Sequence, residues 1–380
     1  MSTSISYPIK TGLVGLGVLS QTSLLPHFVV PDSKEKLDLV SVCDIDKKRA
    51  QITAKSFKIP EYYNNLEDML RNAAIDAVLV CTPSPTLYEV ALTALRAGKH
   101  VYVQKTFANR LEDAQEIIEE ARHRDLVFVA SPEQMLNPAR QAARQMITDG
   151  VIGPVYWGLC VTDNPGPQFE EGRLGEGDLD KIDPSWWFKA DAGPVFNMSV
   201  YSLHSITGLL GPVERVCAFS GQRVKNRAWK DKQIIVEVDD NTLMLLDFGG
   251  GVFALVSGCT AHPGKSVNWG HLSIFGARGA LEIYSTIPGE PNFANVVDHI
   301  GGETYQFDDF RPYIPKEHTQ INFPFIYADI MHFLDCIASG TRPYNFGDQA
   351  CHVVEVIEKA YLAARSGEVQ RINSGFDMEF

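Results

Sequence analysis

The chain has 380 residues, of which 45% are hydrophobic and 21% charged, a globular composition that excludes disordered and collagen-like chains. Its 34 basic and 47 acidic side chains give a formal net charge of −13, which disfavours nucleic acid and anionic membranes because both would repel the protein. We therefore expect no nucleic-acid and no membrane partner. At roughly 150 residues per domain, the length predicts about two domains.

The seven cysteines are scattered and none forms a C-x-x-C pair, so we expect reduced thiols. The spacings H-E-x-x-H and H-x-x-x-H are absent, so no metal is predicted. The N-terminal residues lack the apolar segment of an export signal, and the chain contains no run of about 18 apolar residues. The expectation is a soluble, cytoplasmic protein.

Residues 10–130 alternate short apolar runs with amphipathic stretches, as βα units do. The predicted strands are almost wholly apolar, which is typical of a parallel sheet covered on both faces. They are Thr11–Gly15, Leu39–Cys43, Ala77–Cys81, His100–Val103 and Val127–Ala130. Helices are predicted between them over Asp46–Phe57, Leu87–Ala97 and Leu111–His123. This part of the chain is expected to form a doubly wound α/β domain.

The pattern changes after Pro132, where we place the domain boundary. A helix is predicted over Ala139–Thr148 and a strand over Val155–Val161, and β-rich runs with Gly, Asn and Asp turns then follow. These runs are Ile234–Val238, Thr242–Phe248, Val252–Cys259 and Leu272–Phe275. Two amphipathic helices, Ile326–Ala338 and Cys351–Arg365, close the chain. The second domain is therefore expected to be α+β, on a large and mostly antiparallel open-faced sheet.

A G-x-G motif follows the first predicted strand and opens a predicted helix, the context in which such a motif binds a dinucleotide. Gly15 permits the tight turn and Gly17 leaves room for a pyrophosphate to approach the backbone. The amides around Val18 and Leu19 would point at it from the helix N-terminus. Ser20 takes the place of the third glycine, where a small residue is tolerated.

An acidic residue, Asp44, ends the second predicted strand, 24 positions after Ser20. A carboxylate at this spacing accepts hydrogen bonds from the ribose hydroxyls of NAD and repels the 2′-phosphate of NADP. We therefore expect NAD as the cofactor, with NADP less favoured. In the alternative interpretation, Asp44 only starts the turn into the helix at Asp46.

Three further segments, far apart in the sequence, together match the motifs of one protein family. They are CTP at 81–83 with GKHVYVQKT at 98–106, GVIGPV at 150–155, and GPVFNMSVYSLH at 193–204. In order and spacing they resemble the Gfo/Idh/MocA family, which includes glucose-fructose oxidoreductase and inositol dehydrogenase. The resemblance implies an NAD-binding Rossmann domain over 1–131 and a substrate and oligomerisation domain over 132–380, whose terminal helix could pack back on the first. It also implies cofactor contacts from Thr82, Pro83, Gln104 and Lys105.

Lys105 lies just past the carboxyl end of a predicted parallel strand, where doubly wound folds bind ligands. An ammonium at this place can contact both a nicotinamide ribose and a substrate hydroxyl, and it stabilises the alkoxide that develops as hydride leaves. The alternative is a surface lysine that happens to follow a strand.

Asn197, Tyr201 and His204 are spaced to share one side of a helix, which we expect to meet Lys105 across a domain cleft. In the resemblance, Asn197 stands where aspartate is usual and Tyr201 where histidine is frequent. Tyr201 is therefore expected to transfer the proton. Asn197 would orient the substrate by hydrogen bonds. His204 would either support Asn197 and Tyr201 as a hydrogen-bond partner or be a partly buried helix histidine without a role in the site.

The sequence also departs from the family pattern near the cofactor, where Gln104 and Thr106 replace glutamate and proline and Leu87 replaces a frequent histidine. Of the aromatic run at 186–188, Trp187 is a candidate for stacking on a sugar ring, with core packing as the alternative. His262 and His271, which lie between predicted strands, are weaker candidates for the same site.

The leading prediction is an NAD-dependent oxidoreductase that oxidises a secondary hydroxyl of a sugar, cyclitol or glycoside, with Lys105 and Tyr201 handling the proton. One alternative is a glycoside hydrolase or lyase that keeps NAD bound through a cycle of oxidation, elimination and reduction. Another is a non-catalytic NAD-binding regulator. Because an open sheet face exposes apolar surface, we expect a homodimer or homotetramer formed through that face.

Overall fold

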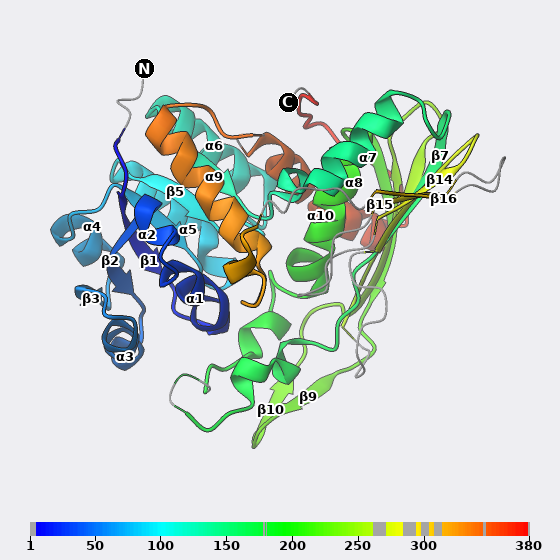
Figure 1. Ribbon diagram of the computed structural model, residues 1–380. Helices are drawn as coiled ribbons and strands as arrows, with labels where there is room; N and C mark the ends of the chain where they lie inside the picture. The colour runs from blue at the N-terminus through cyan, green and yellow to red at the C-terminus, as the bar shows by residue number, and fades with distance from the viewer. Residues whose placement is uncertain are drawn as a thin grey trace. The chain divides into compact units, whose positions relative to one another are not determined.

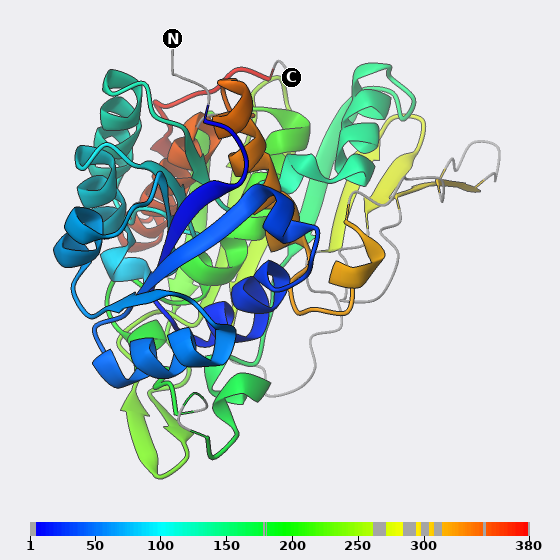
Figure 2. The same cartoon turned by 60° about the vertical axis from the view of Figure 1, so that its left-hand side comes forward.

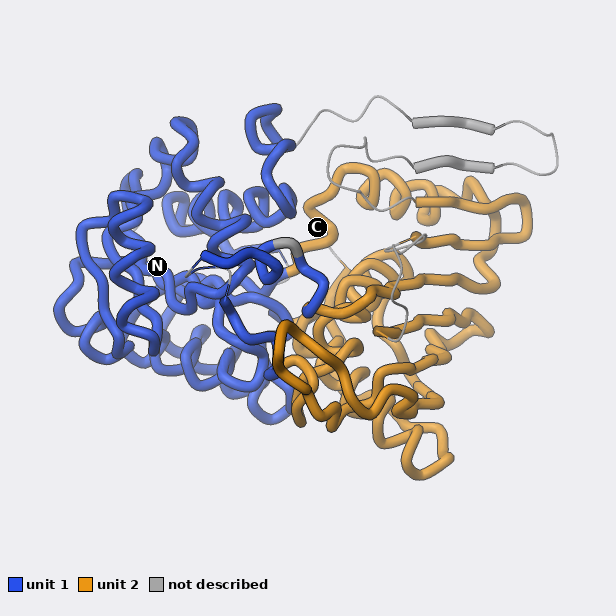
Figure 3. Tube along the Cα trace, turned by 90° about the horizontal axis from the view of Figure 1, so that it is seen from below, with its two compact units in different colours: residues 1–131, 168–186, 314–347 blue, residues 132–167, 187–313, 348–380 orange. Residues whose placement is uncertain are grey.

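The computed structural model describes residues 5–177, 179, 181–260, 271–283, 294–297, 304–307, 314–344 and 347–378. The chain divides into two compact units (Figure 3). Unit 1 holds residues 1–131, 168–186 and 314–347, and unit 2 holds 132–167, 187–313 and 348–380. The first division lies between Ser131 and Pro132. The sequence predicts a continuous second domain over 132–380, whereas the structure groups two later segments with unit 1.

Unit 1 is built on a six-stranded parallel sheet in the order β3-β2-β1-β4-β5-β6. The strands are β1 (Ile9–Val14), β2 (Leu37–Cys43), β3 (Glu61–Tyr63), β4 (Ala77–Val80), β5 (His100–Val103) and β6 (Phe128–Ala130). Five of them confirm the predicted strands. The short β3 is not indicated by the sequence because its three residues are partly exposed and form no apolar run.

Helices cover both faces of this sheet (Figure 1). The helical elements between strands are η1 (Ser20–Leu24), α1 (Leu25–Phe28), α2 (Ser33–Lys36), α3 (Lys47–Phe57), α4 (Leu66–Asn72), α5 (Ser84–Arg96) and α6 (Leu111–His123). Right-handed crossovers place η1 and α3 on one face, and α5 and α6 on the other, because the strand order reverses between β1 and β4. Ligands bind at the carboxyl ends of the strands at such a reversal.

A helix from late in the chain completes the cover of unit 1. The helix α9 (Phe325–Ser339) contacts β5, β6, η1 and α2, so it lies on the η1 face of the sheet (Figure 2). Phe333 of α9 is fully buried and its ring lies 6.2 Å from that of Tyr102 in β5. The terminal helix α10 (Asp348–Ser366) instead belongs to unit 2, where it packs on β8 and α8. The helix that joins the dinucleotide-binding sheet is therefore the penultimate one.

Unit 2 is built on a nine-stranded sheet in the order β16-β15-β14-β13-β7-β12-β11-β8-β17. All neighbours described are antiparallel except β7 and β12, which confirms a mostly antiparallel sheet. The strands are β7 (Val155–Val161), β8 (Arg215–Gly221), β11 (Asn241–Asp247), β12 (Phe253–Cys259), β13 (His271–Gly276), β14 (Ala280–Ile283), β15 (Ala294–Val297), β16 (Thr304–Phe307) and β17 (Gln370–Arg371). A separate ribbon pairs β9 (Asn226–Trp229) with β10 (Lys232–Ile235).

Among the residues that the structure describes, helices cover one face of this sheet and leave the other face open. The helical side holds α7 (Pro138–Thr148), α8 (Val200–Leu210), which follows the π-helical turn η6 (Val195–Ser199), and α10. Burial alternates along β11 and β12, as expected for a sheet covered on one side. The outward positions of β8 and β11 include Phe219, 87% exposed, and Leu243 and Leu245, each about half exposed. The open apolar face that the sequence predicts is thus present.

Candidate functional site

The turn after β1 requires glycine at its first position. Gly15 has a φ of +88°, and a Cβ there would lie 2.4 Å from the carbonyl oxygen of Cys81. Its N–H donates to the carbonyl of Cys43 at 2.9 Å, which ties the turn to the end of β2. Residue 15 therefore lies against both neighbouring strands, and any side chain would push the turn away from β4.

The second glycine faces open space, because a Cβ on Gly17 would meet no atom within 4 Å. The helix starts at Val18 and Leu19, and the N–H of Gln21 donates to the Gly17 carbonyl at 3.1 Å. The hydroxyl of Ser20 donates to the carbonyl of Gly15 at 2.6 Å, so the residue in place of the third glycine fastens the helix to the turn. We call residues 15–20, which form the glycine turn and the start of the helix, the dinucleotide cradle. The open space at Gly17 leaves room for a pyrophosphate beside the helix N-terminus.

Asp44, 7% exposed, is held inside a hydrogen-bond network at the end of β2. Its Oδ2 accepts from the Leu16 N–H at 2.9 Å and its Oδ1 from the Asp46 N–H at 2.9 Å. The Arg49 guanidinium adds contacts at 3.1 and 3.3 Å to the two oxygens. A carboxylate offers about four acceptor positions, so these four contacts occupy all the acceptor positions of Asp44. Asp44 therefore fits both interpretations of the sequence. It binds the turn into α3 through the Asp46 N–H, and it lies beside the glycine turn that is expected to hold the cofactor.

The loop after β4 supplies a polar atom at the same edge of the sheet. Pro83 is exposed and caps the start of α5, and Thr82 precedes it. The Thr82 Oγ1 is buried and has no hydrogen-bond partner among the residues that the structure describes. A buried hydroxyl of this kind fits a contact to a bound ligand. Together with the space above Gly17, it shows that these residues fit a dinucleotide.

Lys105 lies beyond β5, half-buried, and its peptide bond to Thr106 is cis. Burial lowers the pKa of its ammonium to about 8, while Glu170 and Cys81 act in the opposite direction. Gln104 is 3% exposed and its amide donates to the Tyr102 hydroxyl at 2.8 Å, so this side chain is neutral and fixed in the interior. A lysine with a pKa near 8 can donate or accept a proton close to neutral pH.

The segment 168–186 reaches the dinucleotide loop although it follows β7 in sequence. A Cβ on Gly172 would lie 2.9 Å from a methyl of Val18 and 3.0 Å from that of Thr22. Arg173, whose side chain is 6% exposed, pairs with Glu170 at 2.7 Å. Sequence reasoning missed Glu170 because charged residues in a Gly-rich loop carry no periodic signal. Only the tertiary structure brings it near Lys105.

The second group of predicted site residues lies in unit 2. Asn197 is in the π-helical turn η6, 1% exposed, and its amide donates to the Gly193 carbonyl at 2.9 Å. Tyr201 is half-buried in α8. His204 is 4% exposed, and burial together with the nearby His352 lowers its pKa to about 3, so its ring is neutral.

The aromatic run before this helix is mostly enclosed, since Trp187 is 5% exposed and Phe188 1%. This burial matches the core-packing interpretation of Trp187 more closely than an open sugar-stacking face. Among the weaker candidates, the ring of His271 lies 3.4 Å from the Ser273 hydroxyl. His262 lies outside the described residues.

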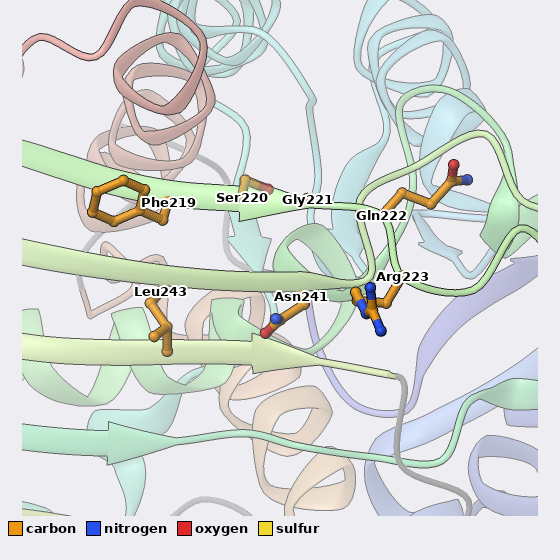
Figure 4. A pocket seen from close by; sticks show the side chains of 7 residues that line it. All are labelled: Phe219, Ser220, Gly221, Gln222, Arg223, Asn241 and Leu243. Atoms are coloured by element: carbon orange, nitrogen blue, oxygen red, sulfur yellow. The ribbon is translucent and has the colours of Figure 1, made fainter.

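A surface hollow on unit 2 contains none of the predicted site residues (Figure 4). It is lined by Phe219, Ser220, Gly221, Gln222, Arg223, Asn241 and Leu243. Five of these residues come from β8 and β11, and Gln222 and Arg223 directly follow β8, so the hollow lies at the end of these two strands. Within the described ranges, no three His, Cys, Asp or Glu side chains gather as metal ligands. Nor do those ranges contain a helix with the length and apolar character needed to cross a membrane.

The parallel sheet, the glycine turn and the acidic residue after β2 are the features of a dinucleotide-binding domain. Residues 9–131 match the model of the Gfo/Idh/MocA oxidoreductase family with its NAD-binding Rossmann fold, and residues 140–282 match the family's C-terminal domain. The chain belongs to the Gfo/Idh/MocA family, as the sequence motifs predict, and it is an NAD(P)-dependent oxidoreductase.

Similar proteins cover nearly the whole chain. D-xylose 1-dehydrogenase [NADP(+)] of Haloarcula marismortui is 23% identical over 98% of this chain and 95% of its own length. The scyllo-inositol 2-dehydrogenase (NAD(+)) of Bacillus subtilis is 23% identical over 96% of both chains. An oxidoreductase domain protein from Kribbella flavida has the same fold, with a TM-score of 0.78 at 20% identity over 97% of this chain and all of its own. Of these relatives, the xylose dehydrogenase is named for NADP and the inositol dehydrogenase for NAD.

Proposed function

We propose that the protein oxidises a secondary hydroxyl of a sugar, cyclitol or glycoside, with NAD as the hydride acceptor. One observation carries the proposal: Lys105, with a pKa near 8, is held at the carboxyl edge of the sheet that bears the dinucleotide cradle. The substrate class is supported by the two relatives above, which are named for a sugar and a cyclitol.

In this proposal bound NAD supplies the hydride acceptor, and the chain's own residues handle the proton. The Lys105 ammonium would stabilise the negative charge that develops on the substrate oxygen. Tyr201 of α8 would accept the proton in its phenolate form, which the positive charge of Lys105 would stabilise. Asn197 would hold the substrate through its amide oxygen, because its amide nitrogen donates to Gly193. His204 and Trp187, which are both buried, would hold Asn197 and Tyr201 in position.

NAD rather than NADP is proposed because a carboxylate, Asp44, lies beside the cradle. Arg49 must release at least one oxygen of Asp44 before a ribose hydroxyl can donate to it. The remaining cradle contacts, from Gly15, Gly17 and the loop at Thr82, suit either dinucleotide. The preference therefore depends on the Asp44–Arg49 pair.

We also propose that the protein forms a homodimer or homotetramer through the open face of the nine-stranded sheet. The exposed apolar side chains of β8 and β11 would be covered by a second copy of the same face. The cytoplasm is the proposed location, because the seven cysteines are thiols, as is usual in a reducing compartment.

The decisive experiment mixes the purified protein with excess NAD and a panel of monosaccharides, cyclitols and glycosides, and follows nicotinamide absorbance. We expect reduced cofactor to accumulate far beyond the amount of enzyme with at least one compound. Cleavage of a glycoside without net reduction would contradict the proposal in favour of a redox-neutral hydrolase. Tight NAD binding with no turnover of any compound would instead indicate a regulator.

A further inference from the structure

We propose that residues 168–177 form a strap over the dinucleotide cradle, and that the cofactor enters and leaves only when this strap lifts. The proposal depends on dinucleotide binding, which the family assignment supports, and not on the proposed sugar substrate. The strap follows β7 in sequence, yet it belongs to unit 1, which contains the cradle.

The strap rests on the first helical turn after the glycine motif. A Cβ placed on Gly172 would lie 2.9 Å from a methyl carbon of Val18 and 3.0 Å from the methyl carbon of Thr22. Carbon atoms that are not bonded to each other pack at about 3.5–4.0 Å, so residue 172 has no room for a side chain in this position. Glycine therefore allows the strap to lie directly on Val18.

The cradle beside this contact is open. A Cβ on Gly17 would meet no atom within 4 Å, although the next residue, Val18, carries the contact with Gly172. The strap thus borders the space expected to hold a pyrophosphate without filling that space. The loop after β4 is another boundary, because a Cβ on Gly15 would lie 2.4 Å from the Cys81 carbonyl oxygen. We expect a dinucleotide at Gly17 to pass between this loop and the strap.

Hydrogen bonds of one arginine hold the strap together. The Arg173 Nε donates to Glu170 Oε2 at 2.7 Å, and the Arg173 backbone N–H donates to the Glu170 carbonyl at 2.9 Å. The Nη1 of the same arginine donates to the Ile182 carbonyl at 2.6 Å, which joins the strap to the chain that follows it. This part of the chain is therefore closed on itself and can move as one piece.

The strap meets the helical turn through apolar atoms. Gly172 faces the methyl groups of Val18 and Thr22, so separating this contact breaks no hydrogen bond at these three residues. Such a contact separates at lower cost than one held by hydrogen bonds, and enzyme lids require this property. In the closed position the strap would retain the dinucleotide, and in the lifted position it would release it.

A reversible cross-link between strap and cradle tests the proposal. A Cβ on Gly172 would lie 3.9 Å from the Val18 Cβ, and a disulfide needs about 3.5–4.5 Å between these atoms. The double variant Gly172→Cys/Val18→Cys should therefore form a disulfide on mild oxidation, and dithiothreitol should open it in the same sample. The single variants Gly172→Cys and Val18→Cys are the matched controls, because each carries one of the substitutions but lacks the partner thiol.

The readout is the exchange of NADH in the full chain, followed by stopped-flow fluorescence without a sugar. In one arm the disulfide is formed on the empty protein, and the association rate of NADH is measured. In the other arm the disulfide is formed after NADH has bound, and its release into excess NAD is measured. NADPH is tested in parallel, and the dinucleotide that the wild type binds more tightly is used throughout.

We expect the disulfide to slow both association and release by at least about tenfold, and dithiothreitol to restore both rates, because exchange then requires the strap to lift. Oxidised and reduced forms of each single variant should exchange the cofactor at rates within about twofold of each other.

A second variant tests the opposite effect. Gly172→Val would push the strap away from Val18, so release of NADH should be at least about threefold faster than in the wild type. Gly375→Val is the control, because a Cβ at residue 375 would meet no atom within 4 Å. Unchanged or slower release in Gly172→Val would contradict the proposal.

An association or release rate that is equal in the oxidised and reduced double variant would overturn the proposal, because the cofactor would then exchange past a closed strap. Failure of the disulfide to form, checked by mass spectrometry of the linked peptides, would also overturn it, since the strap would not lie on Val18. A wild type that exchanges NADH as expected but reduces NAD with no member of the sugar panel would reject only the proposed function.

Discussion

The backbone N–H of Leu16 donates a hydrogen bond to Asp44 Oδ2 at 2.9 Å, so the carboxylate that follows β2 holds the glycine turn that follows β1. The same oxygen lies 3.3 Å from the Arg49 guanidinium. One side chain thus fixes the shape of the cradle and carries the charge proposed to select the cofactor. This double role makes the pair of Asp44 and Arg49 the first target for mutation.

Replacing Arg49 with leucine frees acceptor positions on Asp44 for the ribose of NAD. We expect the KM for NAD to fall about threefold. The KM for NADP should rise, because the substitution removes a positive charge and leaves the Asp44 carboxylate to repel the 2′-phosphate. Initial-rate measurements with both dinucleotides would show this. Arg71→Leu removes an exposed arginine that pairs with Asp68, and it should change neither value. Equal changes for NAD and NADP in Arg49→Leu would contradict the prediction.

The two glycines of the cradle should respond differently to added side chains. Gly15→Ala forces a Cβ against Cys81 and into a left-handed backbone that itself costs about 1–2 kcal/mol, so Tm should fall by several degrees. Gly17→Val places its methyls in open space, so Tm should change little while NAD binding weakens at least about tenfold. Thermal unfolding and calorimetric titration with NAD test the contrast. Normal NAD binding in Gly17→Val would show that the cradle lies elsewhere.

Lys105→Met should lower kcat on the identified substrate by about 10²–10⁴-fold, the usual cost of losing a positioned acid or base. NAD binding should weaken by a few-fold at most, because the change removes only the expected contact of Lys105 to the nicotinamide ribose and leaves the cradle untouched. Tyr201→Phe is expected to behave in the same way. Lys55→Met, on the exposed side of α3, is the control. A loss of less than about tenfold in Lys105→Met would remove this lysine from the chemical step.

Acid should destabilise the fold through its buried histidines. Burial lowers the pKa of His27 to about 4, of His204 to about 3 and of His352 to about 4. The unfolded chain binds these protons near pH 6.5, so the stability from neutral rings is complete above that pH and is lost as pH falls toward 4. Each unit of pKa difference corresponds to at most about 1.4 kcal/mol.

Urea unfolding at several pH values between 7 and 4 measures this loss. His27→Gln should flatten the dependence of the free energy of unfolding on pH. In contrast, His123→Gln, at the exposed end of α6, should leave it as in the wild type. A pH dependence that is identical in His27→Gln and the wild type would exclude this histidine as a source.

A charge on the open sheet face should prevent self-association. Phe219 is 87% exposed in a row with Leu243 of the neighbouring strand, and a carboxylate there would meet its own copy across a twofold interface. We expect Phe219→Glu to be monomeric at concentrations at which the wild type is dimeric or tetrameric, as measured by sedimentation velocity. Val29→Glu, on unit 1, should not change the assembly. An oligomer that survives Phe219→Glu would place the interface elsewhere.

Local patterns in the sequence predict much of unit 1 and the central strands of unit 2. The predicted strand Val155–Val161 coincides with β7, and the Asp46 helix cap accepts from the Arg49 N–H as a cap should. These features depend on neighbours in sequence. The position of α9 on the parallel sheet and the approach of Glu170 to Lys105 depend instead on contacts between distant segments. The contact between Arg49 and Asp44 is a similar case. The sequence predicts that Arg49 lies in a helix, but it does not indicate that the guanidinium binds Asp44.

The assignment of residues 314–347 to unit 1 has a consequence for how this protein is made. Phe333 fills space against Tyr102, and the Ser131 hydroxyl donates to the buried carboxylate of Asp329 at 3.0 Å. A ribosome finishes the sixth strand of the sheet long before it adds these partners. The nascent first 131 residues therefore leave the tunnel with an apolar face uncovered, and the dinucleotide-binding unit closes only after α9 has been synthesised.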